Sequence, residues 1–275
     1  VLEYKENNPH LKIKYYFEVN QGVHYARNSA AKLAEGEILY FTDDDMEADP
    51  YLLSELIPLF DKEPRLGSAT GFVSPIFEVK PPNWVKKNLL NQYLSVTKLD
   101  LPWVYLISKK EEPIGVYSCH QAIRREAFFE SGGFNPENTK GLWIGDGETG
   151  LNIKLQKLGY KFAYTGKSKV WHFIPKTRMT LSYLVTRIQN QANSDSFTEY
   201  RSNKSSVLQL LCEILGRILI LPHRIFLLLK DIFLTKDSWR IKLAAIFYHK
   251  GRISYAVKFI YSKDLRSLAL KDDWL

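Results

Sequence analysis

Three consecutive aspartates, Asp43, Asp44 and Asp45, are the most prominent candidates for chemistry in the sequence. They follow the apolar run 38–41, which has the composition of a buried strand. On an extended backbone alternate side chains point the same way, so Asp43 and Asp45 can share a divalent cation while Asp44 faces a ligand or solvent. Carboxylate oxygens favour Mg²⁺ or Mn²⁺. The alternative interpretation is a solvated acidic turn before a helix that begins at Asp49.

The elements before this acidic triplet predict an α/β fold. Apolar and polar residues alternate over 11–19, which predicts a strand with one buried face. An alanine-rich segment, 23–35, predicts a helix that ends at Gly36, and the strand 38–41 follows. Because a strand, helix and strand in this order form a parallel pair, we expect a mostly parallel central sheet. Ligands bind at the carboxyl edge of such sheets, which is where the aspartates lie.

Further along the chain, patterns of apolar residues predict more strands and helices. Asp49 and Pro50 begin a helix that runs to residue 60, and a helix over 148–158 ends at Gly159. The proline-rich stretch 80–113 is an irregular insert that we expect to line an acceptor cleft. The remaining predicted strands are 66–73, 115–123, 160–164 and 169–173, and helical periodicity dominates from residue 180.

Two blocks of motifs occur in order along the chain. The first block consists of residues 22–29, 34–38 and 40–45, and the second of residues 132–134, 145–148 and 159–161. Together they resemble family 2 of the nucleotide-sugar glycosyltransferases. In that family a Gly...Ala-Arg-Asn helix, an Ala-x-Gly-Glu turn and an acidic Asp-x-Asp loop follow one another, and a later Gly-Gly-Phe turn precedes an acidic pair that opens a helix ending in Gly-Tyr. The resemblance covers residues 11–191 and implies a Rossmann-like GT-A fold.

The resemblance implies a role for each candidate residue. Asp43 and Asp45 would hold Mn²⁺ or Mg²⁺, and a His at the position of His172 often completes the metal site in the family, although a ring packed against Trp171 is an equal alternative. Glu148 matches the general base, with Asp146 as the neighbouring alternative. The alternative interpretation is that Glu148 is an acidic residue in the first turn of a helix, where it stabilises the helix and has no catalytic role. The residues that would contact the nucleotide sugar are Arg27, Asn28, Asp43 and Asp44, and further candidates for the diphosphate or the acceptor are Arg178, Arg187 and Gln191.

These roles combine into an inverting transfer to an acceptor hydroxyl. The cation would neutralise the leaving diphosphate while Glu148 deprotonates the acceptor. A retaining double displacement needs an enzyme nucleophile on the other face of the sugar, and the sequence offers no separate candidate. The alternative function is a non-catalytic remnant that binds a nucleotide sugar or carbohydrate. In the resembling family the strands that bear a nucleobase contact precede the position of Leu11, so we expect an N-terminally extended chain to bind donor more tightly.

The 275 residues divide into two regions of different charge. Residues 1–200 hold 24 Lys/Arg and 24 Asp/Glu, whereas residues 201–275 hold 14 against 6, which accounts for the net charge of +8. We therefore expect a catalytic domain over 1–200 and a basic, amphipathic helical region over 201–275. Charges interrupt the apolar stretch 207–234, where Glu213, Arg217, Arg224 and Asp231 form one polar stripe, so the stretch does not resemble a membrane span.

This basic region favours an anionic membrane surface as a partner. The alternative is a helical subdomain that packs on the catalytic domain or on a second subunit. The basic region has no zinc-ligand spacing or helix-turn-helix pattern, so we expect no nucleic-acid partner. Cys119 and Cys212 lie in unlike segments, which fits a reducing cytoplasm. We expect a peripheral enzyme at the inner face of the cell membrane that uses glycan or lipid-linked acceptors in cell-surface polysaccharide synthesis.

Overall fold

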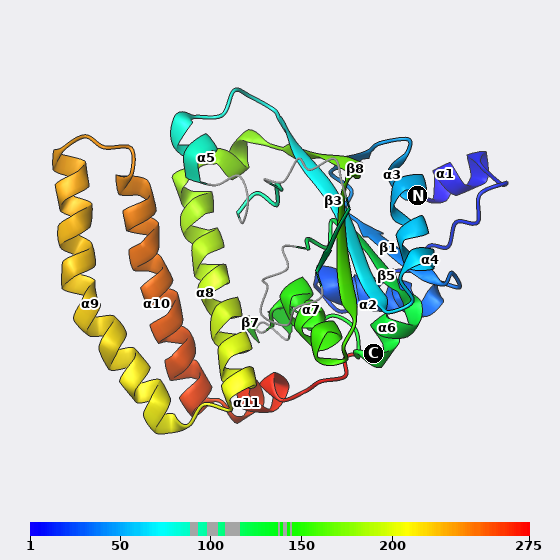
Figure 1. The fold of residues 1–275 in the computed structure, drawn as a ribbon. Helices are drawn as coiled ribbons and strands as arrows, with labels where there is room; N and C mark the ends of the chain where they lie inside the picture. Colours follow the sequence, from blue (N-terminus) through cyan, green and yellow to red (C-terminus); the bar gives the residue numbers. More distant parts are fainter. Residues whose placement is uncertain (89–92, 98–103, 108–115, 137, 140–141, 144) are drawn as a thin grey trace.

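The fold is α/β, with a central sheet between two layers of helices and a row of long helices at one side (Figure 1). The computed structural model describes residues 1–88, 93–97, 104–107, 116–136, 138–139, 142–143 and 145–275. Most of the predicted insert 80–113 lies outside the described residues. The strands are β1 (Ile38–Thr42), β2 (Met46–Ala48), β3 (Leu66–Phe77), β4 (Val104–Ile107), β5 (His120–Arg124), β6 (Asn138–Thr139), β7 (Leu142–Trp143) and β8 (Lys161–Ile174).

The central sheet is mixed, and the prediction of a mostly parallel sheet is wrong. Its strand order is β1-β5-β3-β8-β2, with β4 also paired to β8, and the only parallel pair among the described strands is β3 with β8. The parallel rule applies to strands such as β1 and β3, which a helical connection joins and which run in the same direction. They are not neighbours, because β5 lies between them and runs antiparallel to both.

Helices cover both faces of this sheet. On one face α2 (Val23–Leu33), α6 (Arg125–Glu130) and α7 (Gly147–Lys157) enclose a core around Phe41, Phe128 and Leu155. On the other face α3 (Leu52–Leu56) and α4 (Pro58–Lys62) pack on β3 and β5. The helix expected from Asp49 to residue 60 is thus two short helices, with Pro58 at the start of the second.

The strand predicted over 11–19 does not form. After the short helix α1 (Leu2–Asn7), this segment runs beside α2 without strand structure, and most of its side chains are exposed, including Phe17 at 71%. Alternation of apolar residues indicates a strand only where a neighbouring strand can pair with it. No described strand pairs with this segment. The expected strand, helix and strand unit therefore begins at α2.

Long helices form the C-terminal region. The helix α8 (Leu181–Asn203) begins at Thr180, whose side chain accepts a hydrogen bond from the backbone of Tyr183, and α9 (Val207–Phe233) begins with a capping box at Ser206. In Figure 1, α10 (Trp239–Tyr261) lies between α8 and α9, and α9 is the outermost helix. The remaining short helices are α5 (Asn83–Asn88), the 3₁₀ turn η1 (Lys176–Met179) and α11 (Lys263–Ala269).

The last residues return to the α/β layers (Figure 1). The backbone N–H of Trp274 donates to the carbonyl of Gly132 at 3.0 Å, and Leu275 packs against the core beneath α2 and α7. The ammonium of Lys154 donates to the carbonyls of Gly133 and Asp272, at 2.6 and 3.2 Å. The C-terminus thus closes one side of the α/β core. Among the described helices none is long and apolar enough to span a membrane.

Candidate active site

The predicted site residues meet at one edge of the sheet. A cavity of about 160 Å³ is lined by His24, Arg27 and Glu148, and an adjoining cavity of about 350 Å³ is lined by Asp45, His172 and Arg178. The two cavities have four lining residues in common, so they form one cleft. These shared residues are Asp43, Ser95, Cys119 and Arg187. The carboxylates of Asp43, Asp45 and Glu148 thus line the same depression.

Strand pairing explains why the acidic loop meets residues far away in the chain. Thr42 at the end of β1 is opposite His120 at the start of β5, so the loop after β1 lies beside Ser118 and Cys119. Next, β2 pairs with β8 so that Met46 is opposite His172. This register brings Asp45 beside His172, with 3.3 Å between Asp45 Oδ2 and His172 Nε2.

Arg178 contacts both of these groups. Its guanidinium lies 3.2 Å from Asp45 Oδ2 and 2.9 Å from His172 Nε2. The other ring nitrogen of His172, Nδ1, lies 2.9 Å from the carbonyl oxygen of Leu94. Because a carbonyl only accepts, Nδ1 carries the hydrogen and Nε2 offers its lone pair. Asp45 and His172 therefore present two lone-pair donors toward one positive charge.

Arg27 occupies the corresponding position beside Asp43. It extends from α2, pairs with the Asp43 carboxylate, and donates to the hydroxyl of Ser118 at 2.6 Å. The same hydroxyl donates to Glu148 Oε2 at 3.0 Å. A continuous chain of contacts thus links the acidic loop to Glu148 through Arg27 and Ser118.

The position of Glu148 depends on the turn that starts α7. Gly145 precedes this helix with φ of +96°, and a Cβ atom there would lie 2.2 Å from the carbonyl oxygen of Pro136. Only glycine fits this conformation without strain. Glu148 follows in the first helical turn, where the helix dipole favours a negative charge. The turn therefore directs an ionised carboxylate into the cleft.

The charges around Glu148 control its ionisation. Burial by itself would raise the pKa of this carboxyl group, but the close contact with His24 and the charges of Arg27 and Arg187 outweigh burial and lower the pKa to about 2. The His24 ring is 2% exposed, and its Nε2 lies 3.6 Å from Glu148 Oε2. Glu148 is thus ionised and available to accept a proton at neutral pH.

The chemistry of Asp45 and His172 fits a divalent cation. Asp45 Oδ1 is buried and makes no hydrogen bond to any described residue, so a buried acceptor beside the cleft is unsatisfied. A carboxylate and a neutral imidazole are suitable ligands for Mn²⁺. Asp43 is engaged by Arg27 instead, and the described residues contain no group of three or more His, Cys, Asp or Glu that could hold a metal ion by themselves. Further ligands would have to come from substrate oxygens or water.

Four predicted residues do not line this cleft. Asn28 is buried, and its amide exchanges hydrogen bonds with the backbone of Phe134. Asp146 is also buried behind the start of α7, where Asn135 and Thr198 donate to its carboxylate and burial raises its pKa. Asp44 is exposed, and the Gln191 side chain donates to Asp195. The geometry thus separates Glu148, which faces the cleft, from Asp146.

Sequence reasoning did not single out several residues of the cleft. These are His24, Tyr93, Ser95, Tyr117, Ser118 and Tyr183. His24 had a local signal, because it lies one helical turn before Asn28 on the buried face of α2. Ser118 had none, since its role depends on the pairing of β1 with β5.

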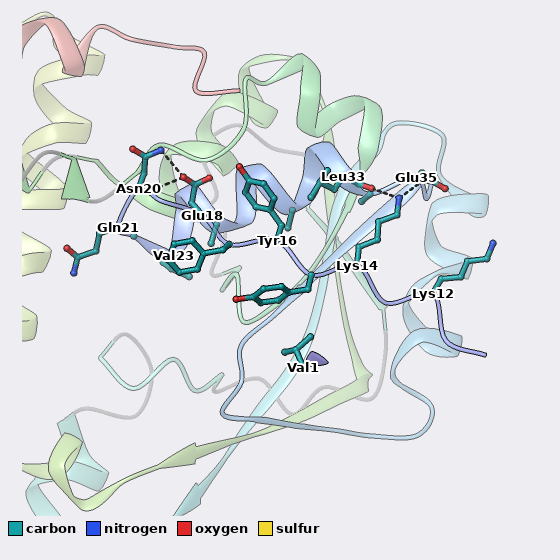
Figure 2. A pocket seen from close by; sticks show the side chains of 16 residues that line it. Val1, Lys12, Lys14, Tyr16, Glu18, Asn20, Gln21, Val23, Leu33 and Glu35 are labelled. Atoms are coloured by element: carbon teal, nitrogen blue, oxygen red, sulfur yellow. Dashed lines mark hydrogen bonds and ion pairs between the residues drawn. The ribbon is translucent and has the colours of Figure 1, made fainter. Parts of the chain in front are cut away.

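A larger cavity of about 930 Å³ lies on the other side of α2 (Figure 2). It is lined by Val23, Leu33 and most residues of the segment 12–21, including Tyr16. Figure 2 shows Lys14 bonded to the carbonyl of Leu33 and to Glu35. The cavity has two carboxylates among its lining residues. Glu18 accepts hydrogen bonds from Asn20 and Ser29, and Glu35 pairs with Lys14, and neither carboxylate lines the cleft. We therefore place the candidate active site in the smaller cleft.

Comparison with known proteins finds a family similar to the N-terminal part of the chain. Residues 1–133 match the family described as glycosyl transferase family 2. This match includes α2, the acidic loop and β5, which position the first half of the cleft. Residues 1–133 are thus similar to the family 2 glycosyltransferases, and the chain has the GT-A fold.

One curated relative and one solved structure illustrate the similarity. Over 177 residues the chain is 22% identical to glucosyl-dolichyl phosphate glucuronosyltransferase from Haloferax volcanii, which covers 61% of this chain and 53% of that protein. The chain thus spans about half the length of this relative. The structure of a mannosyltransferase from Pyrobaculum calidifontis, in complex with GDP-Man and Mn²⁺, aligns with a TM-score of 0.54 at 17% identity. That alignment covers 95% of this chain and 73% of the other, and it supports the fold.

Proposed function

We propose that this protein is an inverting glycosyltransferase that moves a sugar from a nucleotide diphosphate to a hydroxyl of a glycan or a lipid-linked acceptor. The observation that carries this proposal is the single cleft that Asp43, Asp45 and Glu148 line together. The 160 Å³ compartment of the cleft contains Glu148, which would activate the acceptor, and the adjoining 350 Å³ compartment contains Asp45, which would help to bind the donor. Metal-dependent sugar transfer needs that separation, because the nucleophile and the leaving group are on opposite sides of the reacting carbon.

Glu148 is the general base of the proposed reaction. An acceptor hydroxyl in the 160 Å³ compartment would donate its proton to Glu148 as its oxygen attacks the anomeric carbon. The Ser118 hydroxyl and His24 hold the carboxylate in position. Among the described residues that line the cleft, no second carboxylate beside Glu148 is free of an arginine partner, since Asp43 pairs with Arg27 and Asp45 with Arg178. A single displacement therefore accounts for these residues without a covalent intermediate.

The second compartment suits the leaving diphosphate. Arg178 and Arg187 line it and supply positive charge. Asp45 and His172 would hold Mn²⁺ or Mg²⁺, with Asp43 nearby. A bound cation would neutralise the charge that develops on the leaving diphosphate. Arg27, through its contact with Asp43, orients the acidic loop toward this compartment.

The proposed setting is cell-surface polysaccharide assembly at the inner face of the cell membrane. The curated relative is named for transfer to glucosyl-dolichyl phosphate, which is a lipid-linked acceptor, and this supports an acceptor of that class here. The excess of basic residues in 201–275 supports a position near anionic lipid.

The test is sugar transfer with purified protein, Mn²⁺ and a panel of UDP- and GDP-linked sugars. We expect Glu148→Gln to lower kcat by about 10²- to 10⁴-fold, because it removes the proton acceptor without changing the side chain's size. Glu47→Gln is the matched control, since Glu47 is exposed on β2 and should leave kcat unchanged. The product should have the opposite anomeric configuration to the donor, which NMR determines. Donor binding by calorimetry without turnover would favour the non-catalytic remnant.

A further inference from the structure

The helix α9 directs its polar side toward the protein and its apolar side toward solvent, which is the opposite of a typical surface helix in a soluble protein. The polar stripe predicted at Glu213, Arg217, Arg224 and Asp231 does form, but it faces the protein. Glu213 accepts hydrogen bonds from Arg252 at 2.6 Å, from Arg217 at 2.7 Å and from Tyr200 at 2.8 Å. Arg252, on α10, is 3% exposed. A charged network thus holds α9 against α10 and α8.

The second acidic residue of α9 is also turned inward. Asp231 is 2% exposed, and its carboxylate pairs with Lys242 of α10 at 2.8 Å and accepts a hydrogen bond from Ser238. Both carboxylates of α9 are therefore neutralised by groups inside the helical row. No acidic side chain of this helix is left on its outer side.

The outer side of α9 is apolar along its whole length. Leu219, Phe226 and Phe233 are 70%, 61% and 92% exposed. The apolar positions recur every three or four residues, which places them on one side of a helix roughly 40 Å long. The exposed apolar residues of α9 are Val207, Leu208, Leu211, Leu215, Ile218, Leu219, Ile225, Phe226, Leu229, Ile232 and Phe233. We call this surface the α9 outer face.

An apolar surface of this extent is unusual on a protein surrounded by water. The charges around it favour a particular partner. Segment 207–261 contains nine Lys/Arg and three Asp/Glu, and α10 has no acidic residue. Lys230 and Lys236 are exposed at the end of α9 and in the turn after it. An apolar helix face with basic residues beside it matches the surface of a bilayer that contains anionic lipid.

We propose that the α9 outer face docks on the surface of an anionic phospholipid bilayer, with its apolar side chains among the acyl chains and Lys230 and Lys236 at the headgroups. Pro222 supports a position at the interface rather than deep in the bilayer. A proline within a helix removes the bond to the carbonyl four residues earlier, here that of Ile218, and headgroups or water can satisfy that group. The docking itself does not depend on catalysis. The inference rests on the proposed function only in identifying this face as the membrane-contacting surface of a glycosyltransferase.

Vesicle flotation tests this docking without donor or acceptor, so its outcome is independent of catalysis. The full chain is mixed with vesicles of phosphatidylcholine, with and without phosphatidylglycerol. We expect it to float with the anionic vesicles and to bind less at high salt. Leu219→Glu combined with Phe226→Glu should weaken this binding at least ~10-fold, since two charges then enter the apolar region. Lys230→Glu combined with Lys236→Glu should weaken binding to the anionic vesicles in particular.

A matched double variant controls for added charge. Tyr51→Glu with Leu53→Glu places the same charges at the start of α3, where the two side chains are 69% and 50% exposed, and it should bind vesicles as the parent does. Circular dichroism should show the same helix content in each protein. The proposal is overturned if the parent does not float, or if the α9 and α3 variants bind equally. A third outcome would also overturn the proposal: the parent is a dimer, the α9 variant is a monomer, and neither protein binds vesicles. The α9 outer face would then join two copies of the chain.

Discussion

The Nε2 atom of His24 lies 3.6 Å from the Oε2 atom of Glu148, inside the cleft. Neither ring nitrogen of His24 makes a hydrogen bond to any described residue, and the ring packs on Phe134 with 5.2 Å between centroids. Glu148 is therefore its main polar neighbour. This contact is among the influences that lower the pKa of the Glu148 carboxyl to about 2, against the effect of burial. We infer that His24 is a positioning residue that keeps the proposed base ionised.

The first prediction concerns the pH dependence of sugar transfer. His24→Leu removes one influence that lowers the pKa of Glu148, while burial, which raises it, remains. The pKa must then rise, so the acidic limb of kcat/KM against pH should move to higher pH. The measurement is the pH profile of kcat/KM for both proteins.

His10→Leu is the control for this substitution, because His10 is exposed and does not line the cleft. Its acidic limb should coincide with that of the parent. A purely structural role for His24 would lower kcat/KM equally at all pH values, and that result would contradict the inference.

The second prediction concerns the cation. Asp45→Asn removes the negative charge that, with His172, faces Arg178. We expect a chelator to abolish transfer by the parent and Mn²⁺ to restore it. The variant should need at least ~10-fold more Mn²⁺ for half-maximal binding, since an amide oxygen is a weaker ligand than a carboxylate. Electron paramagnetic resonance of bound Mn²⁺ measures this without turnover. Equal Mn²⁺ affinity of Asp45→Asn and the Glu47→Gln control would exclude Asp45 as a ligand.

The third prediction concerns stability below neutral pH. His120 is fully buried, its Nδ1 lies 2.8 Å from the hydroxyl of Tyr40, and burial lowers its pKa to about 4. The unfolded chain takes up this proton below about pH 6.5 but the folded chain only near pH 4. Neutral His120 therefore makes its full contribution to the free energy of unfolding above about pH 6.5. This contribution falls by about 3 kcal/mol as the pH drops to 4.

Urea unfolding at several pH values between 7 and 4 measures this loss. His120→Gln should be less stable than the parent at pH 7 and should lose less stability as the pH falls. His223→Gln replaces an exposed histidine of α9 and should follow the parent curve. Parallel curves for the parent and His120→Gln would contradict the prediction.

Local patterns in the sequence predicted the parts of the site that depend on neighbours along the chain. The helix with Arg27, the strand before Asp43 and the helix that begins beside Glu148 formed within a few residues of their expected bounds. Each depends on local turn signals and short motifs. The partners of these residues were not predictable in this way. Ser118 reaches Arg27 because β5 inserts between β1 and β3, which is a pairing of distant segments.

The C-terminal helices illustrate another limit. Periodicity located the polar stripe of α9 correctly, but a helix with one polar and one apolar side has the same period whichever side faces the protein. Contacts with Arg252 and Lys242 of α10 decide the orientation. Likewise, alternation over 11–19 matched a strand, yet no described strand pairs with it.

The fourth prediction concerns the C-terminal residues, which pack on the α/β layers. Trp274 is 8% exposed, its ring contacts Tyr25 at 6.5 Å between centroids, and its backbone bonds to Gly132. Trp274→Ala should lower the free energy of unfolding by about 3 kcal/mol, because it removes a large buried side chain. Phe233→Ala is the matched control, since Phe233 is 92% exposed and should change stability by less than about 0.5 kcal/mol in the absence of lipid. Urea unfolding compares the two, and equal stability of both variants would mean that the terminal residues do not support the core.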